Sequence, residues 1–167
     1  MKNHFLPGVL LLCVLMLARP AAAADTSAAK NTAVMIRVGL ENKELDLTKL
    51  PLQPYQDGDF WMVPLRLISE ALGYQVSWDK ATGAVTVDDG HIQKATLYNG
   101  TEKVAFEGHL KNIDMSRTIE NAVSTVIHDG YTYVPLVFFS ELLNDVSVED
   151  RVITVAPSMS EINTASN

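Results

Sequence analysis

One stretch of the sequence that decides the fold occurs twice. Residues 62–73 read MVPLRLISEALG, and residues 133–144 read YVPLVFFSELLN. Both copies begin with a Val-Pro-Leu run and carry a Ser-Glu pair at the same place. A repeat of this length predicts that the fold is built from duplicated supersecondary units. No catalytic motif lies in the repeat, so it predicts architecture rather than chemistry.

Each copy is predicted to be a short strand that runs into a short helix. Pro64 and Pro135 suit the first helical position, where the backbone N–H has no intrahelical partner. Gly73 suits the left-handed residue that ends a helix, and Asn144 stands in the same place in the second copy. Between these ends, leucine, isoleucine or phenylalanine recurs at a helical spacing, which predicts one buried face.

Short alternating patterns of apolar and polar residues flank both helices and are typical of strands with one face on the core. We therefore expect an α+β fold made of two repeated units, in which short antiparallel strands pack on one short α-helix in each unit. Unit one is predicted at about residues 34–90 and unit two at about residues 91–155.

The first 24 residues have the pattern of a secretory signal peptide. Lys2 precedes an apolar run over residues 5–17, and small residues follow at 21–24. The run is shorter than the roughly 20 residues that span a bilayer, so we expect cleavage and no membrane insertion afterwards. The protein is thus predicted to be secreted or associated with the cell envelope. Residues 25–33 are predicted to be a flexible lead-in and residues 156–167 a disordered tail.

Cleavage would remove Cys13, the single cysteine, and with it any disulfide, thiolate metal site or cysteine nucleophile. Of 13 basic and 20 acidic residues, the loss of Lys2 and Arg19 leaves 11 against 20, a net charge of −9. So negative a chain is not expected to bind nucleic acid or anionic lipid surfaces.

Residues 63–79 resemble the copper amine oxidase N-terminal-like domain, also called the stalk domain, which is common in exported proteins of Gram-positive bacteria. The matching features are Val-Pro-Leu-Arg, Ile-Ser-Glu-Ala-Leu-Gly and a Val-x-Trp-Asp strand, followed by a Val-Thr-Val strand. The second copy departs from this pattern at Val137, Asn144 and Val148. The resemblance implies two tandem copies of the domain in an exported bacterial protein.

In the oxidases, the similar domain stands apart from the catalytic body, and copper and the quinone belong to other domains. The resemblance therefore implies no cofactor, no metal and no oxidase activity here. Similar domains occur as accessory modules beside cell-wall hydrolases or peptidases, which implies a role in the envelope.

Three histidines remain after the predicted cleavage: His91, His109 and His128. Each lies in or beside a turn-like stretch, and no two have the close spacing of a preformed metal site. We interpret them as surface residues and predict no metal site. Four aspartates raise the question of calcium, but their spacing departs from the calcium-loop pattern. These are Asp57, Asp59, Asp88 and Asp89.

Aromatic residues of the first copy are the candidate contact residues. Phe60 and Trp78 are expected to pack over the helix, because large aromatic side chains are usually buried. Trp61 follows Phe60 on its strand and should face the other way, so it is the first choice for a surface contact. Tyr74 belongs to the same group of aromatic residues and is a second candidate.

The sequence favours a secreted, non-catalytic structural or binding module of the bacterial cell envelope, with no catalytic residues and with Trp61, Tyr74 and Arg66 as binding residues. Arg66 most simply pairs with Glu70 one helical turn on, and any functional use is confined to copy one because Val137 replaces it in copy two. The expected partner is a cell-wall glycan or an envelope protein, contacted through an exposed sheet face or edge. The alternatives are a small metal-dependent hydrolase, or a metal-binding or copper-handling protein, with a site between the two units. The oligomeric state stays open.

Overall fold

A computed structural model describes residues 34–110, 112 and 114–158, which belong to one structural unit. The signal peptide predicted over residues 1–24 and the lead-in predicted over 25–33 lie outside the described residues, as does most of the predicted tail. Among the helices that the structure describes, none is long and apolar enough to cross a membrane.

Strands account for 48% and helices for 9% of the described residues, and the strands form three sheets. The fold is therefore mainly β, and the expected α+β fold with two repeated, helix-packed units is wrong. The local patterns predicted strands but not their partners. All three sheets join strands from both predicted units, so neither unit has a sheet of its own.

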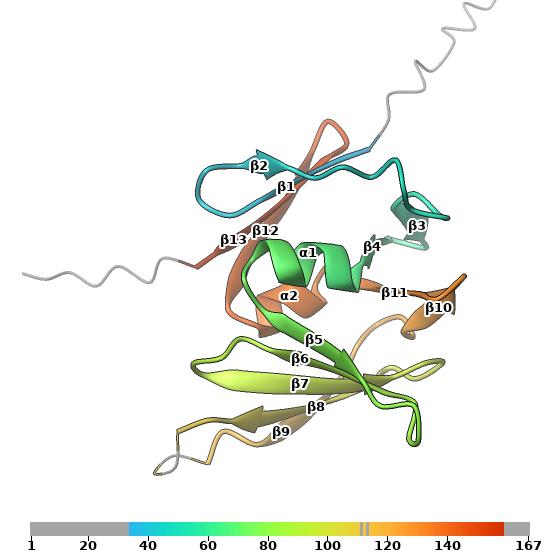
Figure 1. The fold of residues 1–167 in the computed structure, drawn as a ribbon. Coiled ribbons are helices and arrows are strands. Elements are labelled where there is room, and N and C mark those ends of the chain that lie inside the picture. Colours follow the sequence, from blue (N-terminus) through green and yellow to red (C-terminus); the bar gives the residue numbers. More distant parts are fainter. Residues whose placement is uncertain (1–33, 111, 113, 159–167) are drawn as a thin grey trace, which may run out of the picture. The chain divides into compact units, whose positions relative to one another are not determined.

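The two copies of the repeated stretch meet in a four-stranded antiparallel sheet with the order β10-β11-β4-β3 (Figure 1). β4 pairs with β11, and Val63 lies opposite Val134 in this ladder. Asp129 and Gly130 join β10 to β11 with positive φ angles of 48° and 81°, as a type I′ hairpin turn requires. The strands are β3 (Tyr55–Asp57), β4 (Phe60–Pro64), β10 (Val126–His128) and β11 (Tyr131–Pro135).

A second four-stranded sheet joins the two ends of the described chain, in the order β12-β13-β1-β2. β1 runs parallel to β13, with Met35 opposite Val152. Parallel neighbours cannot be joined by a tight turn, and here the rest of the domain connects them. The strands are β1 (Met35–Val38), β2 (Lys43–Glu44), β12 (Asn144–Glu149) and β13 (Val152–Pro157).

The third sheet has five antiparallel strands in sequence order, β5-β6-β7-β8-β9. Its buried residues alternate along β7 and β8, as expected for a sheet with one face on the core. β5 is therefore an edge strand, paired on one side with β6. The strands are β5 (Gln75–Trp78), β6 (Ala84–Asp88), β7 (Gln93–Tyr98), β8 (Lys103–Gly108) and β9 (Arg117–Glu120).

The first helix, α1 (Leu65–Ala71), follows the sequence prediction closely. Pro64 is the last residue of β4 and lies at the N-cap position, one residue before the first helical position predicted for it, and Gly73 has the left-handed φ of 88° just past the helix end. Leu65 and Ile68 point from α1 into the core and are fully buried.

The second helix, α2 (Phe138–Glu141), is shorter than expected and begins beyond Pro135. The left-handed residue at its end is Leu143, with a φ of 59°, so the prediction that Asn144 takes this place is wrong. Asn144 begins β12, and its buried side chain donates hydrogen bonds to the carbonyl oxygens of Phe139 and Leu142. The side-chain amide thus satisfies carbonyl groups that the short helix leaves without an intrahelical donor.

Both helices lie between the five-stranded sheet and the sheet that contains β1 (Figure 1). Buried side chains from all three sheets and both helices form one hydrophobic core. Aromatic rings of α2 fill its centre, where Phe138 packs edge-on against Phe139 with centroids 5.4 Å apart and also lies 6.5 Å from Phe106. Because the removal of apolar side chains from water is favourable, this shared core holds both helices against the sheets.

A polar contact fixes the C-terminal end of α2 to the five-stranded sheet. Arg117 donates hydrogen bonds to the carbonyl oxygen of Glu141 (2.9 Å), its carboxylate (3.1 Å) and Gln93 Oε1 (3.0 Å). Gln93 is buried and donates to the same carbonyl oxygen at 2.9 Å. The Arg117 guanidinium also lies 4.2 Å above the centroid of the Phe106 ring. Both polar atoms of the buried Gln93 side chain thus have a partner, as burial requires.

Candidate binding groove

An apolar groove of about 600 Å³ lies where α1, β5 and the β10–β11 hairpin meet the segment at residues 46–50. A groove of this size is in the range of ligand-binding sites. Its polar lining is confined to a few charged and hydroxyl side chains, and the rest of the described lining is apolar. The lining residues are Asp46, Lys49, Leu50, Pro64, Leu65, Arg66, Leu67, Glu70, Val76, Trp78, Val85, Ile127, Gly130, Tyr131 and Thr132.

Trp78 is the most informative residue of this groove, because its side chain is 57% exposed. It ends β5 opposite Val85 of β6, at the edge of the five-stranded sheet. Ile127 and Tyr131, from the facing hairpin, are exposed large hydrophobic residues of the same groove. Exposed apolar side chains that gather around a hollow make it a candidate interaction site, whereas single exposed ones are normal.

The sequence-based orientation of the aromatic residues is reversed in the structure. Phe60 is 37% exposed and Trp78 is exposed too, although both were expected to pack over the helix. Trp61, the expected surface contact, is partly buried and packs against the core, and its carbonyl oxygen accepts a hydrogen bond from the Leu136 N–H at 2.7 Å. Burial does not alternate along β4 but increases from the exposed Phe60 to the fully buried Met62, so alternation did not predict which of these residues is exposed.

Arg66 joins α1 to the edge of β5. Its Nη1 donates hydrogen bonds to Glu70 Oε1 and to the carbonyl oxygen of Val76, both at 3.0 Å. The i,i+4 pair predicted for Arg66 and Glu70 is therefore present, and both side chains are about half exposed. The second contact, to the strand backbone, was not predicted because β5 is ten residues further along the chain.

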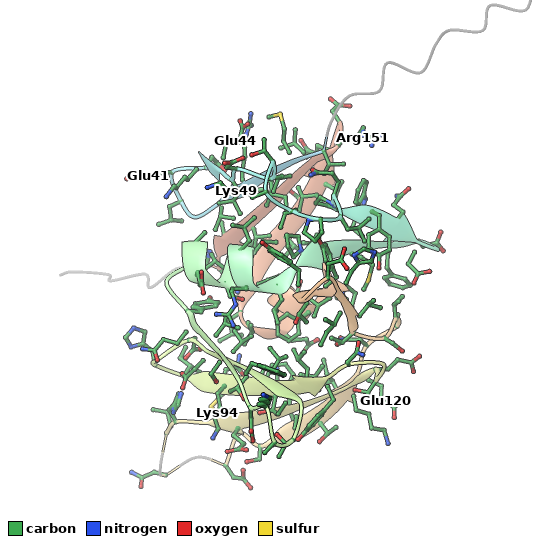
Figure 2. All side chains as sticks on the ribbon, turned by 45° about the vertical axis from the view of Figure 1, so that its right-hand side comes forward. Glu41, Glu44, Lys49, Lys94, Glu120 and Arg151 are labelled. Carbon is green, nitrogen blue, oxygen red and sulfur yellow. The ribbon has the colours of Figure 1, made fainter. Side chains whose placement is uncertain are left out.

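Charges at the rim of the groove cancel. Two lining residues are acidic, Asp46 and Glu70, and two are basic, Lys49 and Arg66. Lys49 lies beside α1 in the view of Figure 2. The hydroxyl and backbone N–H of Thr48 donate to the Asp46 carboxylate and hold the pKa of Asp46 below its ordinary value. The groove is thus a neutral, apolar region on a chain of net charge −7.

The other candidate binding residues do not join Arg66 in the groove. Tyr74 is half-buried, and its hydroxyl donates to Asn144 Oδ1 at 3.0 Å. Burial raises the pKa of Tyr74. Tyr74 and Trp61 both pack against the core, so the structure does not assemble the three candidates into one site. Trp78 and Tyr131 were missed, and the signal that could have found Trp78 is its place directly before a turn at a strand end.

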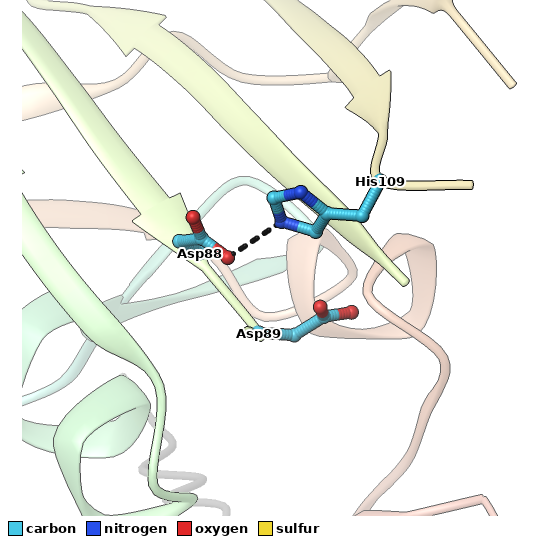
Figure 3. Close-up of side chains that lie close together, drawn as sticks. All are labelled: Asp88, Asp89 and His109. Carbon is cyan, nitrogen blue, oxygen red and sulfur yellow. Dashed lines mark hydrogen bonds and ion pairs between the residues drawn. The ribbon is translucent and has the colours of Figure 1, made fainter. Parts of the chain in front are cut away.

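Asp88, Asp89 and His109 form a separate cluster at the end of the five-stranded sheet (Figure 3). His109 Nε2 lies 2.8 Å from Asp88 Oδ1, which also accepts a hydrogen bond from the Gly90 N–H at 2.7 Å. Asp89 Oδ1 accepts backbone N–H groups of the following turn, at 2.7 to 3.0 Å. One oxygen of each carboxylate caps the turn between β6 and β7, and this role explains why the two aspartates lie together. The ligand atoms of Asp88, Asp89 and His109 lie within 4.8 Å of one another, so among the described residues this is the group of side chains that could hold a metal ion.

Partial burial opposes the ionisation of Asp88, but hydrogen bonds from the Gly90 N–H and the His109 ring outweigh it and hold the pKa of Asp88 below its ordinary value. The three histidines are not brought together. In the β10–β11 hairpin, His128 Nδ1 lies 3.3 Å from Asp129 Oδ2. His91 is an exposed residue of the turn that Asp89 caps.

Together, the three sheets, the two short helices and the groove define a mainly β domain with an apolar groove on its surface. The profile of the copper amine oxidase N-terminal domain family matches residues 40–156, a span that contains both copies of the repeated stretch. The chain belongs to this family.

A protein from Brevibacillus choshinensis, described as a protease inhibitor, is 32% identical to this chain over 102 residues. The match covers 60% of this chain and 28% of that protein, so the chain corresponds to less than a third of its relative. No solved structure matches the chain significantly.

Proposed function

We propose that this protein is an exported, non-catalytic module that binds a segment of a partner protein in the groove between α1, β5 and the β10–β11 hairpin. The observation that carries the proposal is the exposed indole of Trp78 in an apolar groove of about 600 Å³. Tryptophan and tyrosine are enriched among the residues that dominate binding energy at protein interfaces.

A protein segment suits this groove better than the glycan that the sequence also allowed. The lining is apolar around Leu67, Ile127 and Trp78, and the few charged side chains lie in cancelling pairs. Binding of an apolar segment would remove this surface from water, which is the main driving force of association. A carbohydrate would instead need a dense set of polar partners inside the groove.

The cellular setting is part of the proposal. The signal-peptide pattern of residues 1–24 supports export, and the expected place of action is the cell envelope. We further propose that the family domain arose by tandem duplication, with copies at about residues 34–90 and 91–155 whose strands now share the same sheets. The pairing of Val63 with its repeat counterpart Val134 supports this duplication.

The test uses the purified protein, immobilised, against envelope proteins and isolated cell wall, with Trp78→Ala as the binding-deficient variant. Tyr98→Ala is the matched control, because Tyr98 is another exposed aromatic residue on the same sheet that does not line the groove. Retained proteins are purified, titrated and cross-linked. We expect saturable binding that Trp78→Ala weakens at least tenfold and Tyr98→Ala leaves unchanged. Retention by cell wall alone, or equal effects of both variants, would contradict the proposal.

A second candidate function is protease inhibition, which the description of the Brevibacillus relative favours. An inhibitor of this kind would insert part of its own surface into the active site of a protease, whereas the groove would receive a segment of the partner. The assay measures hydrolysis of casein by purified secreted proteases with rising amounts of the protein. Stoichiometric loss of activity that survives in Trp78→Ala would support inhibition through another surface.

A further inference from the structure

The backbone of β5 presents hydrogen-bonding groups to the groove. In an antiparallel ladder, the N–H and C=O groups of successive residues point alternately toward and away from the partner strand. The Asp79 N–H bonds to the Ala84 carbonyl oxygen on the β6 side, whereas the Val76 carbonyl accepts Arg66 on the other side. The N–H and C=O groups of Val76 and Trp78 therefore face away from β6, along the edge that borders the groove.

Arg66 covers this edge only in part. Its Nη1 donates to the Val76 carbonyl oxygen, whereas the outward N–H and C=O of Trp78 make no hydrogen bond with another element in the part of the chain that the structure describes. The side chains of Arg66 and Glu70 are 52% and 54% exposed, so their ion pair contributes little and is readily exchanged for water. The cover is thus a displaceable one.

The facing edge of the groove is closed in a different way. On β10, the Ile127 N–H is bonded by the side chain of Asn99 at 2.9 Å, from a turn fixed by its own backbone hydrogen bonds. The strand edge suited to accept a new partner from the groove is therefore that of β5. Edge strands with unsatisfied backbone groups are the sites at which peptides add to sheets.

We infer that the partner segment adds to the five-stranded sheet as an extended strand along β5, displacing Arg66 from the Val76 carbonyl oxygen. This inference rests on the proposed function and specifies how the same groove is used. The occupant is an uncharged, apolar stretch of polypeptide in a β conformation. Alternate side chains of the added strand would contact Trp78 on the β5 side of the groove and Ile127 and Tyr131 on the hairpin side.

The charge of the groove supports this choice of occupant. Asp46 with Lys49 and Arg66 with Glu70 leave no net charge at the lining, which suits a neutral peptide. A strongly acidic segment would be repelled by the chain as a whole, which carries a net charge of −7.

Strand addition predicts that removal of Arg66 increases the affinity for the peptide. If Arg66 competes with the incoming strand for the Val76 carbonyl oxygen, its removal should tighten binding. Because the peptide would no longer have to break the hydrogen bond between Arg66 and Val76, its affinity should increase about three- to tenfold. If Arg66 instead held the ligand, as the sequence suggested, its removal would weaken binding.

The experiment selects random ten-residue peptides, displayed on phage, on the purified protein with counter-selection on Trp78→Ala. Selected peptides are then synthesised with and without N-methyl groups at alternate residues, which remove donors but keep the side chains. Affinities are measured for the parent protein, Arg66→Met and, as a matched control, Lys103→Met, which removes another exposed ion-paired cation outside the groove. Hydrogen exchange at the Trp78 amide is followed with and without peptide.

We expect the Trp78 amide to become protected, methylation in one alternation phase to abolish binding, and Arg66→Met alone to tighten it about three- to tenfold. Strand addition would be overturned if methylated peptides bound equally well, the Trp78 amide stayed unprotected and Arg66→Met bound more weakly. The groove would then remain a binding site. Failure to enrich any peptide dependent on Trp78 would overturn both this inference and the proposed function.

Discussion

Val63 and Val134, which occupy the same place in the two repeated stretches, lie directly opposite each other in the antiparallel ladder between β4 and β11. Both side chains are fully buried. On one side of this pair Pro64 precedes α1, and on the other Pro135 precedes the turn into α2. The repeat therefore pairs with itself, and each copy completes the sheet of the other.

The first prediction concerns this pair. Val63→Ala and Val134→Ala should each lower the free energy of unfolding by about 2 kcal/mol, from lost burial and the cavity left behind. Because the two residues are paired neighbours, the double variant should depart from additivity by at least about 0.5 kcal/mol. Urea denaturation of all four proteins measures this cycle. Strict additivity would indicate that the two copies are energetically independent.

The second prediction contrasts the two helix ends. Leu143 has a φ of 59°, a conformation that costs a residue other than glycine about 1 kcal/mol. Its side chain is half exposed, so little burial is lost on its removal. Leu143→Gly should therefore stabilise the protein by about 1 kcal/mol, despite the glycine. Gly73→Ala should destabilise it by about the same amount, because the added Cβ meets no atom within 4 Å and only the φ of 88° is strained. Thermal unfolding tests the opposite signs, and equal signs would contradict the assignment of the helix ends.

A third prediction concerns the contact between α2 and the five-stranded sheet. Arg117→Met keeps much of the packing on Phe106 but leaves the buried Gln93 Oε1 without its donor. We expect a loss of about 1 to 3 kcal/mol of stability, the cost of an unsatisfied buried polar group. In Lys103→Met, which removes an exposed ion pair of the same sheet, stability should change by less than about 1 kcal/mol. Similar losses in both variants would refute the role given to Arg117.

The fourth prediction is a pH dependence. The folded-state pKa of Asp88 lies below its ordinary value of 3.8, so this carboxylate stabilises the fold at neutral pH. That contribution is lost as the pH falls below about 3.8 and through the folded-state pKa. Asp88→Asn should accordingly be less stable than the parent at pH 7, and the difference should shrink toward pH 2. Glu149→Gln, an exposed change on β12, serves as the control. A difference that grows on acidification would show the opposite linkage.

Local features of the repeat were predictable from the sequence. Pro64 and Gly73 mark the ends of α1, and the turn residues Asp129 and Gly130 join β10 to β11. These signals act over a few residues, through the fixed φ of proline and the tolerance of glycine for positive φ. The second helix shows where such signals fail. The sequence predicts Asn144 as the left-handed residue at its end, but a helix shortened to residues 138–141 moves that position to Leu143.

Features that depend on distant strands could not be predicted. The parallel pairing of β1 with β13 joins Met35 to Val152, and no local pattern specifies such a partner. The exposure of Trp78 has the same cause, because it depends on what packs over the end of β5. Propensity favours burial of tryptophan, but at the sheet edge the facing hairpin leaves the groove open.

Fluorescence of Trp78 tests the central claim most directly. The chain has two tryptophans, so Trp61→Phe leaves Trp78 as the sole reporter. In the absence of peptide, its emission should be that of a solvent-exposed indole and should be quenched efficiently by acrylamide. Addition of a groove-binding peptide selected as above should shift the emission to shorter wavelength and protect it from the quencher. An indole that is already shielded in the unliganded protein, or one that stays fully quenchable at saturation, would contradict the account.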